Sequence, residues 1–355
     1  MRKPHVFENV KKILIIKPSA LGDIVHTLPF LAAIRKQFPD AKIDWVVASG
    51  LHTFLEDHPM INRLWIFKKD QWRRLKNIKT TLREISEFKK GLKAAQYDVS
   101  IDLSGLLRSG IITYFSNAKI KLGFKESDEG SPFFYTHKIH GSMNIHAIDR
   151  YLEIAKFMGC SVDKIEYPFA PHDHHPPILN TLPEKYSVMS PSAGKPANRW
   201  PAQKFGQLAA KLDLPTVVIA SKSEADIAQK VVDHSNGKAI SVAGKTGLKD
   251  LLAVIENACF FVCNDTGPMH IAAALNIPVF AIFGPANPVR TGPYGTIHTV
   301  ISENLDCSPC YAQKPCDDFK CMENIHVERV FDMISANDYI KTDDTKSDSI
   351  RAGLT

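Results

Sequence analysis

Two short polar turns carry residue types that can bind or process an anionic substrate. One comprises residues 264–270 (NDTGPMH), between an apolar stretch that predicts a buried strand and a run of helix-forming residues. Asp265 or Thr266 can cap that helix, Gly267 lets the backbone approach a ligand, and Pro268 suits the first helical position. The amide groups and helix dipole at such a turn stabilise a phosphate, although an ordinary capped turn has the same pattern.

The other turn lies near the N-terminus. Residues 11–17 form a short β-branched run that is typical of a central parallel strand. The turn after it contains Ser19, Gly22 and Asp23, and it leads into a stretch with apolar residues at helical spacing. Ligands of open α/β sheets bind beyond the carboxyl ends of the strands, so a site is expected between Ser19 and His26. The alternative is that Asp23 only caps the helix.

Basic residues concentrate between positions 68 and 93. This segment holds ten Lys and Arg residues against three acidic ones, whereas the whole chain has a formal net charge of only +6. A local basic surface suits an anionic partner such as a phosphorylated lipid, a membrane surface or nucleic acid. A solvated helix face is the alternative.

Four of the seven cysteines form a C-x2-C-x5-C-x4-C cluster, namely Cys307, Cys310, Cys316 and Cys321. In a cytosolic chain this pattern favours metal or thiol chemistry over structural disulfides. The second pair is spaced more widely than in a zinc knuckle, which weighs against a metal. Three histidines also occur in a Pro-rich segment, at His172, His174 and His175. There we expect a solvated linker, because such a chain does not preorganise metal ligands.

These candidate sites need a scaffold, and strand and helix patterns alternate along both halves of the chain. This alternation predicts an α/β protein of two Rossmann-like, doubly wound parallel-sheet domains that face each other across a cleft. The predicted boundaries are 1–167 for the first domain, 168–183 for a linker, 184–340 for the second domain and 341–355 for a polar tail. An irregular loop is expected over residues 125–139.

Several protein classes are disfavoured by what the sequence lacks. It contains no G-x-G-x-x-G, no P-loop and no G-x-S-x-G motif, which disfavours dinucleotide oxidoreductases, P-loop enzymes and α/β-hydrolases. No stretch approaches the roughly 20 apolar residues that span a bilayer, and the N-terminus lacks the apolar core of a signal peptide. The chain is therefore expected to be cytoplasmic.

Five motifs together carry a family resemblance, at residues 19–29, 102–109, 199–201, 264–270 and 283–288. In this order and spacing they resemble the ADP-heptose:lipopolysaccharide heptosyltransferases, which are inverting glycosyltransferases of the two-domain GT-B fold. The resemblance extends over about residues 11–330. Residues 105–109, the segment around Trp72 and residues 146–150 are most similar to heptosyltransferase I, the member that adds the first heptose to the Kdo of lipid A.

The resemblance implies roles for individual residues of this chain. Asp23 corresponds to the family's general base, which takes the proton of the acceptor hydroxyl. The implied donor-binding residues are Ser19, Gly22, Lys195, Arg199, Glu224, Asp265, Thr266, Gly267, Pro268 and His270. The implied acceptor-binding residues are His26, Lys69, Arg73, Arg74 and Arg108. The family often has a Lys where this chain has Asn198, and Arg199 and Lys195 are the two candidates to supply the missing cation.

The resemblance also implies partners and location. The partners are ADP-heptose, a Kdo-lipid A type acceptor and the inner-membrane surface, with no nucleic acid and no required cofactor. A structural metal at the Cys cluster remains an option. One alternative is a transferase of the same fold that adds a later heptose or another nucleotide sugar. An alternative from a different class is a non-catalytic protein that binds nucleic acid or metal.

Overall fold

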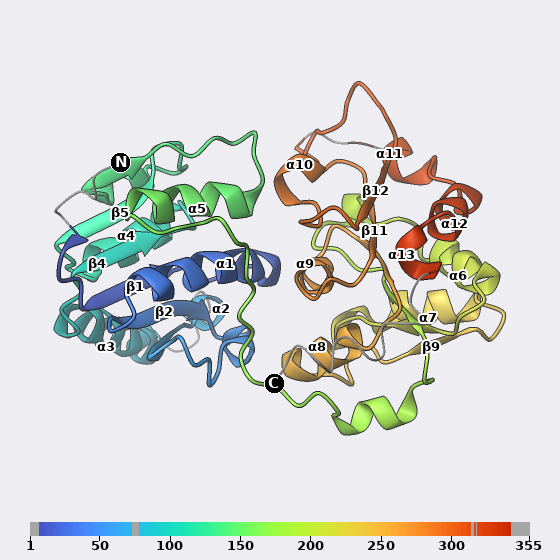
Figure 1. Ribbon diagram of the computed structural model, residues 1–355, viewed down its shortest axis with the longest axis horizontal. Coiled ribbons are helices and arrows are strands. Elements are labelled where there is room, and N and C mark those ends of the chain that lie inside the picture. The colour runs from blue at the N-terminus through green and yellow to red at the C-terminus, as the bar shows by residue number, and fades with distance from the viewer. Residues whose placement is uncertain (1–6, 73–77, 314–315, 317, 342–355) are drawn as a thin grey trace. The chain divides into compact units, whose positions relative to one another are not determined.

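The computed structural model describes residues 7–72, 78–313, 316 and 318–341, which divide into two compact units (Figure 1). The first unit ends at Pro171 and the second begins at His172. This division falls inside the predicted linker. The predicted tail lies outside the described residues apart from Lys341, and so do Arg73 and Arg74.

The first unit is built on a six-stranded, fully parallel sheet in the order β3-β2-β1-β4-β5-β6. Apolar strand residues such as Ile13 and Ile15 are completely buried, as expected for strands with helices on both faces. The elements are β1 (Lys12–Ile16), α1 (Leu21–Gln37), β2 (Lys42–Ala48), η2 (His52–Phe54), β3 (Arg63–Phe67), α2 (Lys69–Trp72), α3 (Ile78–Ala94), β4 (Val99–Asp102), α4 (Leu107–Phe115), β5 (Ile120–Phe124), η4 (Ser131–Phe134), β6 (His137–Ile139) and α5 (Ala147–Phe157).

The second unit repeats this architecture with the strand order β12-β11-β10-β7-β8-β9. Its elements are η5 (Pro177–Thr181), β7 (Ser187–Ser190), η6 (Pro196–Asn198), α6 (Ala202–Lys211), β8 (Thr216–Val218), η7 (Lys222–Glu224), α7 (Ala225–Asp233), β9 (Ala239–Ser241), α8 (Leu248–Glu256), β10 (Phe261–Asn264), α9 (Gly267–Ala274), β11 (Val279–Phe283), α10 (Pro288–Thr291), β12 (Thr299–Ser302), α11 (Lys320–Glu323), α12 (Val327–Ser335) and α13 (Asp338–Lys341). The predicted class, two doubly wound parallel α/β sheets, is confirmed.

Each sheet has one point at which the strand order reverses. In the first unit the chain fills one side of β1 and then returns to the other side with β4, and in the second unit β7 and β10 have the same relation. The loops after two such strands diverge and leave room for a ligand at the carboxyl edge of the sheet. Both polar turns singled out in the sequence lie at these two positions.

The expected irregular loop over residues 125–139 was wrong in part. It contains the 3₁₀ helix η4 and the edge strand β6, which pairs in parallel with β5. The three residues of β6 are His, Lys and Ile, and they are half-buried or exposed. Such a short polar strand has no apolar periodicity, so sequence patterning does not detect it.

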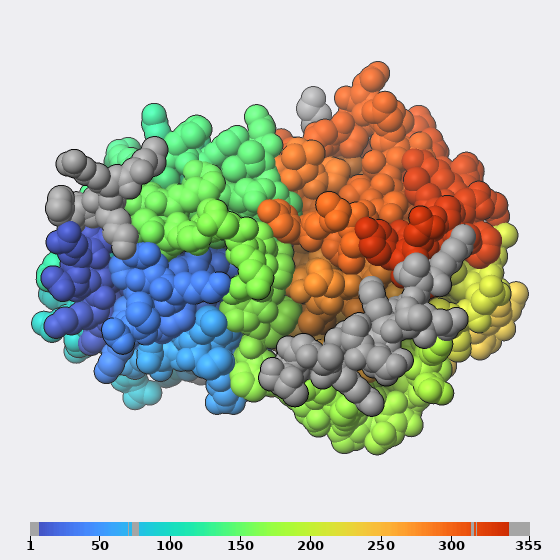
Figure 2. Space-filling model, viewed as in Figure 1, coloured from blue at the N-terminus to red at the C-terminus, as the bar shows by residue number. Residues whose placement is uncertain are grey.

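The chain between the two units is anchored before it leaves the first one. Residues after α5 run in extended form over the surface of this unit, as the light-green band of atoms in Figure 2 shows. The ammonium group of Lys36 lies 2.8 Å from the Glu166 carboxylate, and His58 Nε2 donates a 2.8 Å hydrogen bond to the carbonyl oxygen of Pro168. Phe169 packs edge-on against Phe54 at 6.1 Å between ring centroids. The first residues of the predicted linker therefore belong to the first unit.

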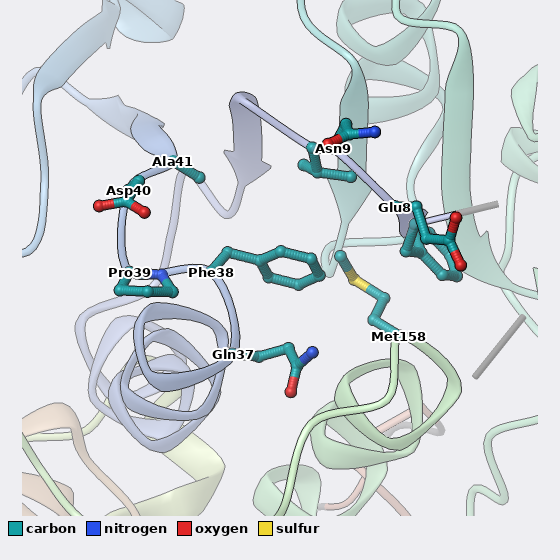
Figure 3. Close-up of a pocket in the computed structure, with 10 residues that line it drawn as sticks. Glu8, Asn9, Gln37, Phe38, Pro39, Asp40, Ala41 and Met158 are labelled. Carbon is teal, nitrogen blue, oxygen red and sulfur yellow. The ribbon is translucent and has the colours of Figure 1, made fainter. Parts of the chain in front are cut away.

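A pocket of about 270 Å³ lies at the amino edge of the first sheet. It is lined by residues before β1, by the end of α1 and by Met158 after α5, and the side chains of Phe38 and Met158 point toward each other across it (Figure 3). Because ligands of this fold class bind at the opposite, carboxyl edge, this pocket is not the candidate site. No helix in the described part of the chain has the length and apolar character needed to cross a membrane.

Candidate active site

Asp23 lies in the first turn of α1, directly beyond the carboxyl end of β1. One carboxylate oxygen, Oδ2, accepts a 2.9 Å hydrogen bond from the backbone N–H of Ala20, the residue that precedes the helix. The other, Oδ1, lies 3.3 Å from the ammonium group of Lys17 and accepts a 3.2 Å hydrogen bond from the hydroxyl of Tyr151. The Asp23 side chain is nevertheless 38% exposed. Asp23 therefore caps the helix and also presents an oriented carboxylate to solvent.

Lys17 and Tyr151 form a buried support beneath this carboxylate. Burial is the largest single influence and lowers the pKa of Lys17, but the charge of Asp23 and the contact with Tyr151 together outweigh it, so the net pKa is raised above the ordinary lysine value. Burial and the nearby Asp23 raise the pKa of Tyr151 to about 12. Lys17 also donates a 3.2 Å hydrogen bond to the carbonyl oxygen of Leu103, at the end of β4. The ammonium and the phenol are thus charged and neutral, respectively, at neutral pH, and they hold Asp23 in one position.

The loop after β4 forms the neighbouring wall of this edge. Asp102 is fully buried, and it accepts hydrogen bonds from the backbone N–H groups of Ser104 and Gly105 and from the hydroxyl of Tyr135. Burial raises the pKa of Asp102, although these hydrogen bonds oppose the shift. Gly105 has a φ of +67°, and a Cβ there would lie 2.4 Å from Ser127 Oγ, so only glycine fits. The buried carboxylate of Asp102 therefore holds the conformation of the loop after β4 through these hydrogen bonds.

The described acceptor residues implied by the family resemblance lie on three different helices, α1, α2 and α4. His26 is buried and contacts the His146 ring edge-on at 5.0 Å, so it supports the site from inside α1. Arg108 is half-buried in the first turn of α4, and Lys69 is half-buried at the start of α2. Beside Lys69, Glu84 accepts hydrogen bonds from Lys68 and from the indole of Trp72.

In the second unit, Asn264 connects the two loops at the reversal point. Its buried side chain accepts a 2.9 Å hydrogen bond from the backbone N–H of Trp200 and donates a 2.7 Å hydrogen bond to the carbonyl oxygen of Pro191. Thr266 is the residue before α9, and Pro268 lies in the first turn of that helix. The backbone N–H groups at the N-terminal end of α9 therefore lie beside the loop after β7. This is the arrangement expected for a phosphate site.

A pocket of about 370 Å³ opens at this edge. It is lined by Gly194, Lys195, Asn198, Asp265, Ala286, Arg290, Thr291 and Tyr311. The ammonium group of Lys195 donates a 2.7 Å hydrogen bond to the carbonyl oxygen of Tyr311, and the Arg290 guanidinium lies 6.0 Å from the Tyr311 ring centroid. Two cations, Lys195 and Arg290, therefore line the pocket that also contains Asn198.

Arg199, by contrast, is bound to protein groups beside this pocket. Its guanidinium donates two hydrogen bonds to the carbonyl oxygen of Ala193 and lies 3.2 Å from Glu224 Oε1. The other carboxylate oxygen of Glu224 accepts a 2.7 Å hydrogen bond from the hydroxyl of Ser221. Arg199 thus orients Glu224, while Lys195 and Arg290 are the cations that face the pocket.

The remaining donor residues implied by the resemblance lie in different places. Ser19 and Gly22 belong to the first unit, in the loop and first helical turn beside Asp23. In the second unit, Gly267 is half-buried at the start of α9, and His270 is buried one turn further along the same helix.

The four clustered cysteines line one cavity of about 330 Å³. All four are free thiols, and burial together with the neighbouring cysteines raises the pKa of Cys321. Within the described residues their sulfur atoms do not form a group close enough to share a metal ion. The structure therefore gives no support for a metal at this cluster.

The interpretation of the Pro-rich histidines as solvated is wrong for His172, whose side chain is only 7% exposed. The carboxylate of Glu256, at the C-terminal end of α8, lies 2.8 Å from His174 Nδ1 and 3.4 Å from His172 Nε2. His175 remains exposed. The segment was expected to be flexible because of its prolines, but these two contacts attach it to the second unit.

Three site residues were not anticipated from the sequence, namely Lys17, Tyr151 and Arg290. Lys17 follows the first apolar run directly, and a charged residue at the end of a buried strand can be recognised in the sequence as a candidate site residue. Tyr151 lies 128 positions from Asp23, and no local pattern reveals such a contact. Arg290 follows the 283–288 motif closely, and its position next to that motif could have identified it.

Comparison with known proteins matches residues 85–320 to the model of glycosyltransferase family 9 (heptosyltransferase). The chain is 29% identical over 293 residues to lipopolysaccharide heptosyltransferase 1 of Escherichia coli, covering 80% of this chain and 91% of that protein. It is 26% identical over 315 residues to the lipopolysaccharide core heptosyltransferase OpsX of Haemophilus influenzae, covering 84% and 86% of the two chains.

Among solved structures, E. coli heptosyltransferase WaaC with ADP is similar at a TM-score of 0.75 and 25% identity, covering 92% of this chain and 99% of that chain. The structure of E. coli ADP-heptose lps heptosyltransferase II, at 19% identity and a TM-score of 0.73, shares the fold and covers 94% of this chain and 99% of that chain. The resemblance stated from the sequence motifs is confirmed. Since the family model spans most of the chain, this protein belongs to glycosyltransferase family 9, the heptosyltransferases.

Proposed function

We propose that this heptosyltransferase transfers heptose from ADP-heptose to the Kdo sugar of lipid A, with inversion at the anomeric carbon. The observation that carries the proposal is the carboxylate of Asp23, which Lys17 and Tyr151 orient at the carboxyl edge of the sheet while part of it remains exposed. Relatives named lipopolysaccharide heptosyltransferase 1 and a similar structure with bound ADP support the choice of reaction and donor.

In the proposed reaction Asp23 acts as the general base. Its exposed carboxylate accepts the proton of the acceptor hydroxyl as the hydroxyl oxygen forms a bond to the anomeric carbon of heptose. The bond between that carbon and the diphosphate oxygen breaks, and ADP leaves with the electron pair. A carboxylate is a sufficient base because the hydroxyl becomes strongly acidic only as the new bond forms. Lys17 keeps the carboxylate in place without lying on the solvent side, since it is itself buried.

The second unit provides the proposed seat for the leaving diphosphate. Negative charge increases on ADP as the bond breaks, and the first-turn N–H groups of α9 stabilise that charge. Lys195 and Arg290, which both line the pocket at this edge, supply positive charge. In this proposal they replace the family lysine that is absent at Asn198.

Glu224 is proposed to bind the adenosine ribose. Each of its oxygens accepts one hydrogen bond, from Ser221 or Arg199, so each retains a lone pair for a ribose hydroxyl. Paired hydrogen bonds of this kind are common between a carboxylate and a ribose diol. Arg199 acts as a positioning residue, because it contacts Glu224 and Ala193.

The proposed acceptor carries phosphates and is embedded in the inner membrane. Lys69 and Arg108 in the described residues, with Arg73 and Arg74 outside them, are the cations proposed to bind it. The enzyme would then act in the cytoplasm, peripherally bound to the inner membrane. The proposed chemistry uses protein side chains and N–H groups, and it requires no cofactor and no nucleic acid.

The deciding experiment incubates the protein with ADP-heptose and Kdo-bearing lipid A and measures the product by mass spectrometry. The expected result is addition of one heptose, unchanged by a chelator. Product formed only with an acceptor that already carries heptose would favour a later step, as in the relatives named lipooligosaccharide heptosyltransferase 2. Loss of product in the presence of chelator would support the hypothesis of a metal bound at the Cys cluster. No transfer to either acceptor, together with salt-sensitive nucleic-acid binding, would favour the non-catalytic alternative.

A further inference from the structure

Helix α4 exposes an apolar stripe on the surface of the first unit. Leu107, Ile111 and Tyr114 are spaced by four and three residues, so they share one helix face, and all three are exposed, Tyr114 to 60%. The 3₁₀ helix η4 packs on α4 and adds Phe133, whose side chain is 89% exposed. An isolated exposed apolar residue needs no explanation, but several on adjoining elements mark an interaction surface.

A basic pocket adjoins this stripe. It has a volume of about 400 Å³ and lies between α3 and α4, with Lys89, Lys90 and Lys93 on one side and Lys121 on β5. Its other lining residues are Ser86, Tyr114, Phe115 and Asn117, so none of the described residues that line it is acidic. Four lysines without a lining carboxylate give the pocket a positive potential that attracts an anion. Tyr114 belongs to both the stripe and the pocket, and the two are therefore continuous.

Helix α3 shows the same combination on its outer face. Ile78 and Leu82 are exposed, Leu82 to 60%, although both are large apolar residues. At 100° per residue, these two positions lie within about 60° of Lys89 and Lys93 around the helix. Leu92 is fully buried and lies about 40° from Ile78 on the other side, so this exposed strip borders the buried face of α3. Apolar side chains mixed with lysines on one face are the pattern of elements that lie in a membrane interface.

We propose that the exposed face of α3, α4 and η4, the docking face, binds the surface of an anionic lipid bilayer. The lysine pocket would take the phosphate of a lipid headgroup, while Phe133, Tyr114 and Leu107 enter the boundary between headgroups and acyl chains. Charge complementarity favours this occupant, because the four lysines of the pocket attract anionic headgroups. The exposed apolar side chains of the stripe are stabilised by contact with acyl chains. The proposal refines the membrane association included in the proposed function, but the docking itself does not depend on which sugar is transferred.

The test measures binding of the full chain to phosphatidylcholine vesicles with and without phosphatidylglycerol, by sedimentation. The chain is expected to bind only the vesicles that contain phosphatidylglycerol. The double variant Lys90→Gln with Lys93→Gln should weaken this binding about 10-fold to 30-fold, since each lysine near an anionic surface contributes roughly fivefold. Phe133→Ser should weaken it about tenfold by removing the most exposed apolar side chain.

The matched control is Lys230→Gln with Lys245→Gln, which removes the same charge from exposed positions on the second unit. It should bind vesicles like the unmodified chain. Equal binding to both vesicle types, or equal losses in the control and pocket variants, would overturn the proposal. Transfer to a water-soluble Kdo acceptor should be unchanged in all variants, and a loss there would assign the pocket to the acceptor. Absence of transfer by the unmodified chain would refute the proposed function and leave the vesicle result standing.

Discussion

Replacing Asp23 by asparagine tests the proposed base without changing the shape of the site. The amide oxygen of Asn can still accept the hydrogen bond from the backbone N–H of Ala20 that Oδ2 accepts now. The substitution removes the negative charge and the ability to take a proton. A positioned general base contributes about 10²-fold to 10⁴-fold, which corresponds to about 3–5 kcal/mol of transition-state stabilisation. We therefore expect turnover to fall by at least two orders of magnitude, with ADP-heptose affinity nearly unchanged.

The same substitution has a structural cost that must be separated from the catalytic one. It leaves the buried ammonium group of Lys17 without its carboxylate partner. Removing one partner of a fully buried pair costs about 3–5 kcal/mol, but Asp23 is 38% exposed and water can replace part of the interaction. We expect a loss of about 1–2 kcal/mol, which is small beside the total stability of about 5–15 kcal/mol typical of a domain.

A double variant distinguishes the two roles. Lys17→Met together with Asp23→Asn removes the buried charge along with its partner, so stability should recover relative to the single variant. If Asp23 is the base, the double variant remains inactive. The assay is single-turnover heptose transfer followed by mass spectrometry, with donor binding measured by calorimetry and stability by urea unfolding. Near-normal turnover in Asp23→Asn, or recovery of activity in the double variant, would refute the assignment.

Three further predictions concern the second unit. Arg290→Ala should raise the dissociation constant for ADP about tenfold, because it removes a pocket cation, and an unchanged constant in calorimetry would contradict the diphosphate seat. Asn264→Ala should lower the free energy of unfolding by about 2–3 kcal/mol, because it leaves two buried backbone groups unpaired, and a smaller loss in urea titrations would show that water replaces the amide. Burial lowers the pKa of His298 to about 4, below its unfolded value near 6.5, so the folded state binds fewer protons and stability should fall by about 3 kcal/mol as the pH drops from 6.5 to 4. Urea midpoints for His298→Gln should lack this part of the pH dependence, and identical pH profiles for the two proteins would count against it.

Sequence patterning predicted the parts of this protein that depend on local periodicity. The apolar run predicted as a strand at residues 11–17 contains β1, and the stretch with helical spacing after Asp23 lies within α1. The edge strands β6 and β12 were missed, because each has only three or four residues and at most two consecutive apolar ones. Their pairing comes from the sheet rather than from their own residues.

The residues of the candidate site also differ in whether the sequence predicts them. Asp23 and Thr266 follow strands directly, so their place at a sheet edge could be inferred from the chain order. The support of Asp23 by Tyr151 depends on how α5 packs against α1, which is a tertiary contact without a local signal. The role of Arg199 was left open by the sequence, since a cation beside a phosphate loop and a cation bound to Glu224 have the same pattern.

The chain is anchored on both sides of Pro171, once within each unit. Pro168 is hydrogen-bonded to His58 in the first unit, and His172 contacts Glu256 in the second. Only four residue steps separate these two anchors, and such a segment spans at most about 14 Å when fully extended. In the proposed function the two units contribute different groups to one reaction, and a longer tether would lower the effective concentration of one unit at the other. Lengthening it with glycine and serine should therefore slow transfer without weakening the binding of ADP to the second unit.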